Sequence, residues 1–153
     1  MTNKNYLAIF AKSFNWAGFF LPKKIYEDCA KLYAFCRVRD NVADEENNLD
    51  SKIERFNKIK SFYKNTYALS NKEIRSLDKN EMIINDMVAL AEKNKIKRII
   101  LDDLIDGVSS DLKKKIHVNS VKDLLIYSYK VAGTVGLMMS KILNVNDRRA
   151  LKG

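Results

Sequence analysis

The chain has 153 residues, of which 46% are hydrophobic and 31% charged, and its formal net charge is +9. These proportions exclude a disordered chain and allow one buried core. The positive charge is compatible with nucleic acid, anionic lipid or diphosphate partners, but the lysines are spread along the whole sequence, as on a solvated surface. Because no nucleic-acid-binding motif accompanies them, we expect no nucleic acid partner.

The sequence predicts an all-α fold. Strand signals are almost absent, and one proline and five glycines leave little to interrupt helices. No linker or internal repeat marks a second domain. The expected helices, in chain order, cover residues 6–20, 22–44 with Pro22 in the first turn, 51–69 with a capping box of Ser51 and Glu54, 78–94, 97–112, 120–143 capped by Ser120, and a further helix beginning at Asp147.

The N-terminal segment, residues 1–20, has aromatic character, but Lys12 and Asn15 interrupt it before a signal-peptide core could form. The longest uncharged stretch late in the chain, residues 131–140, is too short to span a bilayer. We therefore expect a cytoplasmic protein whose membrane contact is at most peripheral, at the inner membrane face.

Two cysteines, Cys29 and Cys36, lie on the helix expected over residues 22–44. Their spacing separates the Cα atoms by roughly 10 Å along a helix, which is too far for a disulfide. Two buried free thiols fit a reducing compartment such as the cytoplasm.

Two carboxylates continue the semi-apolar face of that same helix. Asp40 and Asp44 share a face with Cys29, Tyr33 and Cys36. Ionised carboxylates do not stay inside a protein without a partner or a metal. Because their Cβ atoms are roughly 5–6 Å apart, the two side chains can bind one Mg²⁺ together with substrate phosphates.

Two other interpretations of the pair remain open. Arg37, at the edge of the face, is a possible ionic partner for either carboxylate. From spacing alone, a solvated acidic helix end is the commoner arrangement.

The helix expected over residues 120–143 carries small residues on one face. Ala132, Gly133, Gly136 and Ser140 share this face with Tyr129. We expect the bulkier side chains on the opposite face to pack against the protein, namely Leu124, Tyr127, Val131, Thr134 and Met138. Each interior glycine costs a helix about 1 kcal/mol relative to alanine, so the two glycines require a reason. Close helix packing and a ligand groove both supply one.

Four stretches together resemble the squalene/phytoene synthase family, the head-to-head prenyl synthases. Residues 32–45, Leu-Tyr-Ala-Phe-Cys-Arg-Val-Arg-Asp-Asn-Val-Ala-Asp-Glu, are similar to the first aspartate-rich motif of the family. Residues 12–14 with Leu21 and Pro22 resemble its opening helix and turn, and residues 100–111 resemble the segment between its two aspartate motifs. The most specific block is 127–136, Tyr-Ser-Tyr-Lys-Val-Ala-Gly-Thr-Val-Gly.

The resemblance implies an isoprenoid-synthase-type helical bundle and a Mg²⁺-dependent prenyltransferase of carotenoid biosynthesis. The expected reaction condenses two geranylgeranyl diphosphates head-to-head to phytoene through a cyclopropyl diphosphate intermediate, as in bacterial phytoene synthases. A squalene-type synthase that uses farnesyl diphosphate, with NADPH in its reducing members, is the alternative.

For the diphosphate, the resemblance assigns Asp40 and Asp44 to Mg²⁺ and places Arg37 to steady the carboxylates or the diphosphate. Ser13 is expected to contact the diphosphate near the first helix, and Tyr33 is expected to shape the cavity around the carbocation.

For the isoprenoid tail, the resemblance assigns the small face of the long helix. Tyr129 is expected to shape the cavity around the carbocation, and Ala132, Gly133 and Gly136 are expected to line the slot for the tail.

The sequence departs from the family pattern in two ways. Asn41 stands where the family usually has a second aspartate directly after the first. The second aspartate motif of the family would follow on a later helix, beyond residue 153. We therefore expect a single partial domain over residues 1–153. It could be a shortened enzyme, one subunit of a split enzyme completed by a second chain, or a non-catalytic remnant that binds prenyl diphosphates.

A further aspartate-rich stretch, residues 102–106, reads Asp-Asp-Leu-Ile-Asp and matches the DDxxD signature of chain-elongating prenyl synthases. In the resembling family this stretch is the intermediate Leu-Ile-Asp-Gly segment. We therefore expect it to be structural.

Overall fold

The computed structural model describes residues 16, 18–38, 42, 48–68, 77–112 and 118–145. All regular structure within these ranges is helical, which confirms the all-α prediction for this part of the chain. The predicted helix from Asp147, and the predicted helix 6–20 apart from its end, lie outside the described residues.

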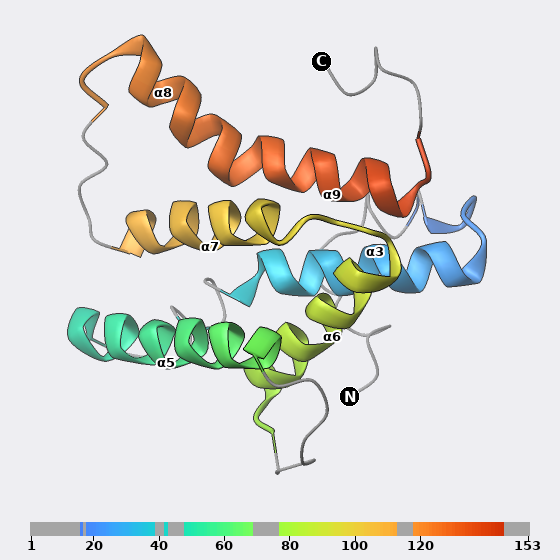
Figure 1. Ribbon diagram of the computed structural model, residues 1–153, viewed down its shortest axis with the longest axis horizontal. Coiled ribbons are helices and arrows are strands. Elements are labelled where there is room, and N and C mark those ends of the chain that lie inside the picture. The colour runs from blue at the N-terminus through green and yellow to red at the C-terminus, as the bar shows by residue number, and fades with distance from the viewer. Residues whose placement is uncertain are drawn as a thin grey trace.

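Figure 1 shows α3 (Lys23–Cys36) at the centre of the molecule, with other helices on both sides. Helices α5 (Leu49–Ala68) and α6 (Lys79–Lys93) lie on one side. Helix α7 (Arg98–Leu112) lies on the other, below a rod formed by α8 (Val121–Ser128), the π-helix η1 (Tyr129–Gly133) and α9 (Thr134–Ile142). Helix α3 packs against α6 and α9, and α7 packs against α5 and the rod.

Local sequence signals explain most of the helix starts. Pro22 is the N-cap of α3, one residue before the first turn in which it was predicted. The Ser120 hydroxyl accepts from the Asp123 N–H at 3.1 Å and so caps α8, as predicted. A full capping box opens α6, because Asp78 accepts from the Glu81 N–H while Glu81 accepts from the Asp78 N–H.

The predicted capping box of Ser51 and Glu54 is wrong. Helix α5 begins earlier, at Leu49, because the Asn48 side chain accepts from the N–H groups of Asp50 at 2.7 Å and Ser51 at 3.1 Å. Asn48 thus satisfies the donors of the first turn, and Ser51 lies inside the helix.

The core is apolar and draws on every long helix. It combines the inward faces of α3, α5, α6, α7 and α9, and its most deeply buried members include Leu32, Tyr63, Ile84, Met87, Leu101 and Met138. Burial of a large aliphatic side chain contributes roughly 1.5–3 kcal/mol, so these contacts hold the helices together. An ion pair between Asp28 of α3 and Lys93 of α6 lies at the edge of this core.

The rod contains a π turn that the sequence did not predict. The Thr134 N–H bonds to the Tyr129 carbonyl, five residues back, and the Thr134 hydroxyl bonds to the Lys130 carbonyl at 2.8 Å. A π turn holds more residues than an α turn, so it rotates α8 relative to α9. The predicted single face therefore does not extend through the whole rod.

The two halves of the rod are buried to different extents. Thr134 and Met138 are fully buried, as predicted, whereas no residue of α8 is buried and Leu124 is 48% exposed. The predicted packing role of Leu124 is therefore wrong. Figure 1 shows the reason, because α8 diverges from α7 toward its N-terminal end.

Gly107 allows α7 and the rod to approach closely. A Cβ added at Gly107 would lie 2.9 Å from the Lys130 Cβ and 3.1 Å from a methyl carbon of Val131. At Gly136, by contrast, an added Cβ would meet no atom within 4 Å. The two glycines thus have different roles, one in helix packing and one beside open space.

We expect Gly107→Ala to lower the free energy of unfolding by about 1–3 kcal/mol through overpacking, although alanine favours a helix. Gly136→Ala is the matched control and should be neutral or stabilising by up to about 1 kcal/mol. Urea unfolding followed by circular dichroism measures both. Equal stabilities of the two variants would contradict the close approach at Gly107.

Candidate functional site

The C-terminal end of α3 carries the first group of predicted site residues. Tyr33 and Arg37 lie one turn apart and are both partly buried, while Phe35 beside them is buried. Arg37 caps the helix, and its N–H bonds to the carbonyls of Tyr33 and Ala34. The predicted ligands Asp40 and Asp44, and the predicted diphosphate contact Ser13, lie outside the described residues.

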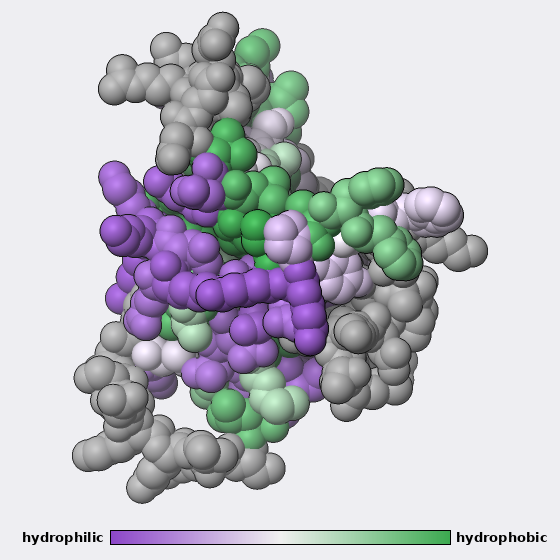
Figure 2. All heavy atoms as spheres, turned by 90° about the vertical axis from the view of Figure 1, so that its right-hand side faces the viewer, coloured by the Kyte–Doolittle hydropathy of each residue, from purple (hydrophilic) through white to green (hydrophobic). Residues whose placement is uncertain are grey.

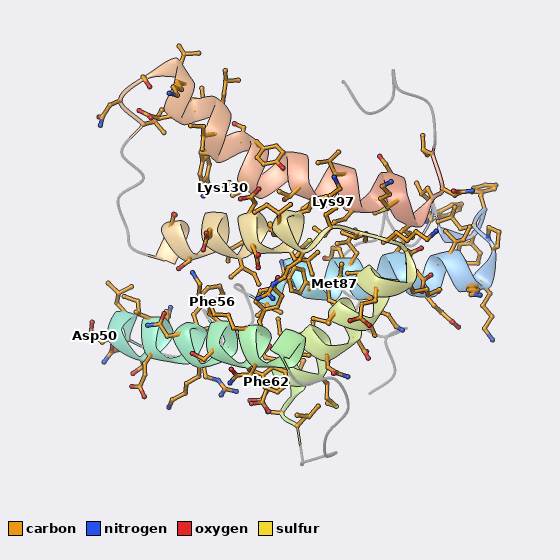
Figure 3. The ribbon with its side chains drawn as sticks, in the orientation of Figure 1. Asp50, Phe56, Phe62, Met87, Lys97 and Lys130 are labelled. Atoms are coloured by element: carbon orange, nitrogen blue, oxygen red, sulfur yellow. The ribbon has the colours of Figure 1, made fainter. Side chains whose placement is uncertain are left out.

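A small apolar cavity lies beside this end of α3. Its walls come from α3, α5, α6, α7 and Val38, which follows α3. They consist of Phe35, Cys36, Val38, Phe56, Ile59, Lys60, Ile84, Leu104, Ile105 and Val108. Its volume is about 20 Å³, roughly the space for one water molecule. Figure 3 shows Phe56 on the side of α5 that faces α7. The cavity is too small for a long isoprenoid tail, so a tail would need another surface.

Both cysteines are free thiols, as predicted. Cys29 is buried, and its thiol lies 3.6 Å from the Met139 sulfur of α9. Burial raises the pKa of Cys29, and the neighbouring Asp28 charge raises it further. Cys36 lines the cavity but is only partly buried as a residue, and desolvation of its thiol raises the pKa to about 12. Neither thiol is therefore set up as a nucleophile.

We expect Cys36 to resist alkylation in the folded chain. Near pH 8, iodoacetamide should modify it at least about 100-fold more slowly than in urea, because its thiolate is almost absent. Peptide mapping by mass spectrometry separates Cys36 from Cys29. Similar rates with and without urea would show that the thiol is not desolvated.

The Asp-Asp-Leu-Ile-Asp stretch faces α5 through two of its carboxylates. Asp102 accepts a hydrogen bond from the Tyr63 hydroxyl at 2.7 Å, and Asp106 accepts one from the Lys60 ammonium at 2.7 Å. These bonds join α5 to α7 beside the cavity. The geometry fits the predicted structural role of the stretch.

The sequence reasoning missed Lys60 and Tyr63. They continue the apolar stripe that begins at Phe56 and Ile59, with the spacing i, i+3, i+4, i+7 typical of a buried helix face. Polar groups on such a stripe need buried partners, and this signal could have indicated the contacts with α7.

Asp106 lies among positive charges from two helices. The hydrogen bond from Lys60 has the largest effect and lowers the pKa of Asp106. Desolvation opposes it, and the charges of Lys60, Lys130 and Lys64 lower the pKa further. Figure 3 shows Lys130 on the side of the rod that faces α7. The Asp106 side chain is half exposed, so the ion pair contributes less than about 1 kcal/mol.

Because folding lowers the pKa of Asp106, its ion pair with Lys60 stabilises the fold above the unfolded pKa of about 3.9. This stabilisation is lost as the pH falls through the folded pKa. We therefore expect Asp106→Asn to lower stability near neutral pH by less than about 1 kcal/mol and to match the parent chain near pH 2. Asp103→Asn on the same helix is the control. Urea unfolding at several pH values measures the free energy of unfolding of each variant. A stability difference between Asp106→Asn and the parent chain that persists near pH 2 would contradict the prediction.

The rod carries the second group of predicted site residues. Tyr129 is 42% exposed, and Ala132 and Gly136 are exposed. A Cβ added at Gly133 would lie 3.0 Å from the Tyr129 ring, so the ring sits directly on the Gly133 backbone. Beyond this ring, Ala132 and Gly136 form an open strip bordered by the Ser140 hydroxyl, which bonds to the Gly136 carbonyl at 2.9 Å.

Helix α7 contacts the rod and lies beside the end of α3, the two elements that carry the described predicted residues. It packs against the rod at Gly107 and lines the cavity beside the end of α3 with Leu104, Ile105 and Val108. The open strip and the end of α3 are thus connected through one helix.

No cluster of three or more histidine, cysteine, aspartate or glutamate side chains that could hold a metal ion occurs among the described residues. The Mg²⁺ site at Asp40 and Asp44 stays a prediction. Within the same described ranges, no helix has both the length and the apolar character needed to cross a bilayer.

Comparisons with known proteins agree with the motifs. The squalene/phytoene synthase family model matches residues 8–152. The chain is 30% identical over 140 residues to 15-cis-phytoene synthase of Paracoccus sp. (strain N81106 / MBIC 01143), an alignment that covers 90% of this chain and 44% of that protein. It is 27% identical over 153 residues to 15-cis-phytoene synthase of Pantoea ananas, covering 95% and 47%.

A phytoene synthase of Rhodobacter capsulatus is 27% identical over 139 residues, covering 91% of this chain and 39% of that protein. The chain belongs to the squalene/phytoene synthase family, as its motifs predicted. It spans less than half the length of these three relatives.

Proposed function

We propose that this chain provides one side of a prenyltransferase site that condenses two geranylgeranyl diphosphates head-to-head to phytoene. Membership of the family and the names of its bacterial relatives support this reaction class. The structural observation that carries the proposal is the open strip of Ala132 and Gly136, which continues from the Tyr129 ring on a rod whose exposed residues are mostly apolar. An isoprenoid tail needs such an unobstructed apolar surface.

The diphosphate end of the proposed site lies at the end of α3. Asp40 and Asp44 would hold Mg²⁺, because two carboxylates one helical turn apart supply the hard oxygen ligands that it prefers. When bound, Mg²⁺ would neutralise the charge that develops on the departing diphosphate. The guanidinium group of Arg37 is permanently charged and carries several N–H donors, so it would hold the diphosphate or orient the carboxylates.

The tail end of the proposed site lies on the rod. The Tyr129 ring, which lies against the Gly133 backbone, would present its face to the carbocation. The quadrupole of an aromatic ring stabilises a cation at this face. The strip beyond it would bind the tail. Polypeptide that corresponds to the remaining length of the relatives would close the site and exclude water, either in the same chain or as a second chain.

The open strip proposed to bind the isoprenoid tail is tested by a substitution that fills it. We expect Gly136→Leu to weaken Mg²⁺-dependent binding of geranylgeranyl diphosphate at least about tenfold, because the new side chain would occupy the strip, where an added Cβ meets no atom within 4 Å. Binding of inorganic pyrophosphate should be unchanged. Ala89→Leu, on an exposed face of α6, is the matched control. Equilibrium dialysis with radiolabelled ligands measures both, and undiminished binding by Gly136→Leu would contradict the proposal.

The metal end is tested by neutralising the aspartates. The double substitution Asp40→Asn and Asp44→Asn should abolish the Mg²⁺-dependent part of binding for both ligands, whereas Asp103→Asn should not. Loss of binding in Asp103→Asn would move the metal to the DDxxD stretch.

The identity of the substrate is tested with Mg²⁺ and each labelled diphosphate. Squalene from farnesyl diphosphate, without phytoene from geranylgeranyl diphosphate, would favour the squalene-type alternative.

A further inference from the structure

Three aromatic side chains project from the segment that precedes α3. Trp16, Phe19 and Phe20 are 72%, 80% and 86% exposed. Scattered exposed apolar residues are ordinary on protein surfaces, but three large, mostly exposed aromatic side chains within five residues are a local concentration of apolar surface. We call these three residues the aromatic patch.

The aromatic patch is built on an ordered turn. The Phe19 N–H bonds to the Trp16 carbonyl at 3.2 Å, and the Leu21 N–H bonds to the Gly18 carbonyl at 3.1 Å. The Trp16 and Phe19 rings meet edge to face, with centroids 6.4 Å apart. The turn therefore holds the aromatic side chains in a defined arrangement.

Two contacts fix this turn to the body of the protein. A Cβ at Gly18 would overlap the Tyr26 ring, so the Gly18 backbone lies directly on that ring. Leu21 packs against the core. Because the turn is anchored through Gly18 and Leu21, its three aromatic side chains are directed outward.

Positive charge adjoins the aromatic patch. Lys23 and Lys24, in the first turn of α3, are both exposed, and Glu27 is the exposed carboxylate on the next turn. Lys141 is exposed in the last turn of α9, which ends on the same side of the molecule as α3 begins (Figure 1). Figure 2 looks at this end and shows hydrophobic side chains across it, bordered by hydrophilic ones.

We propose that the aromatic patch with Lys23 and Lys24 docks the protein on the surface of an anionic phospholipid bilayer. Aromatic rings favour the boundary between headgroups and acyl chains, and neighbouring lysines attract anionic lipid. Each feature alone gives weak binding, whereas the two together give stable docking. The proposal does not depend on the proposed prenyltransferase reaction, because none of these residues belongs to the proposed site.

Trp16 is the only tryptophan in the chain, so it reports directly on docking. With vesicles of phosphatidylglycerol and phosphatidylcholine, its emission should shift to shorter wavelength, and brominated lipid should quench it. The chain should sediment with these vesicles and much less with pure phosphatidylcholine.

Substitutions separate the two components of docking. The double variant Phe19→Ser and Phe20→Ser retains Trp16 and should partition at least about tenfold less onto anionic vesicles. Lys23→Glu with Lys24→Glu should lower the preference for anionic lipid by at least about fivefold per lysine. Met82→Ser, which removes a half-exposed apolar side chain from α6, is the matched control and should bind as the parent does.

Circular dichroism should show the same helical content in all variants, because the substituted side chains are exposed. Absence of sedimentation by the parent chain, or equal binding by the Phe19→Ser and Phe20→Ser variant, would overturn the proposal. A change in Trp16 emission that depends on protein concentration without lipid would overturn it too, because it would identify the patch as an interface between copies of the chain.

Discussion

The burial of α3 is the constraint on which the rest of the structure depends. Leu32 and Cys29 are each 1% exposed, and they are enclosed by side chains of α6 and α9, elements distant in the sequence. A helix enclosed in this way cannot rotate or slide without opening the core. Its two ends are therefore fixed relative to all other helices, the aromatic patch at its start and Tyr33 and Arg37 at its end.

Helix α7 extends this constraint to the rod. On one side it joins α5 through the bonds from Tyr63 to Asp102 and from Lys60 to Asp106. On the other, the absence of a side chain at Gly107 brings it against Lys130 and Val131. The position of the Tyr129 ring and of the open strip therefore follows from the packing of a helix that carries no predicted site residue.

The exposure of the rod is consistent with the length of the relatives. Helix α8 has no buried residue, and Leu125 is 64% exposed, although its composition is apolar. The alignments leave more than half of each of two bacterial phytoene synthases unmatched. A face of this kind gains stability when further helices cover it, because apolar surface is removed from water. Under the proposed function, the open strip on the rod would become a pocket once such helices cover it.

The sequence by itself determined the helical class, the family and the order of the motifs. These follow from local features: few helix breakers, capping residues such as Asp78 and Ser120, and the run of residues 127–136. It also fixed the state of the cysteines, because a helix separates Cys29 from Cys36 too far for a bond. The start of α5 was misread because Asn48 and Ser51 are both good capping residues, and only the backbone geometry distinguishes them.

Tertiary structure alone decided the rest. The π turn at Tyr129–Gly133 changes the face that the rod presents, and no periodicity rule based on α geometry contains it. The different roles of Gly107, Gly133 and Gly136 depend on which neighbours surround them, and glycine carries no side chain from which those neighbours could be inferred. The outward direction of the aromatic patch likewise depends on the contact of Gly18 with Tyr26, since hydrophobic composition alone would have placed those rings inside.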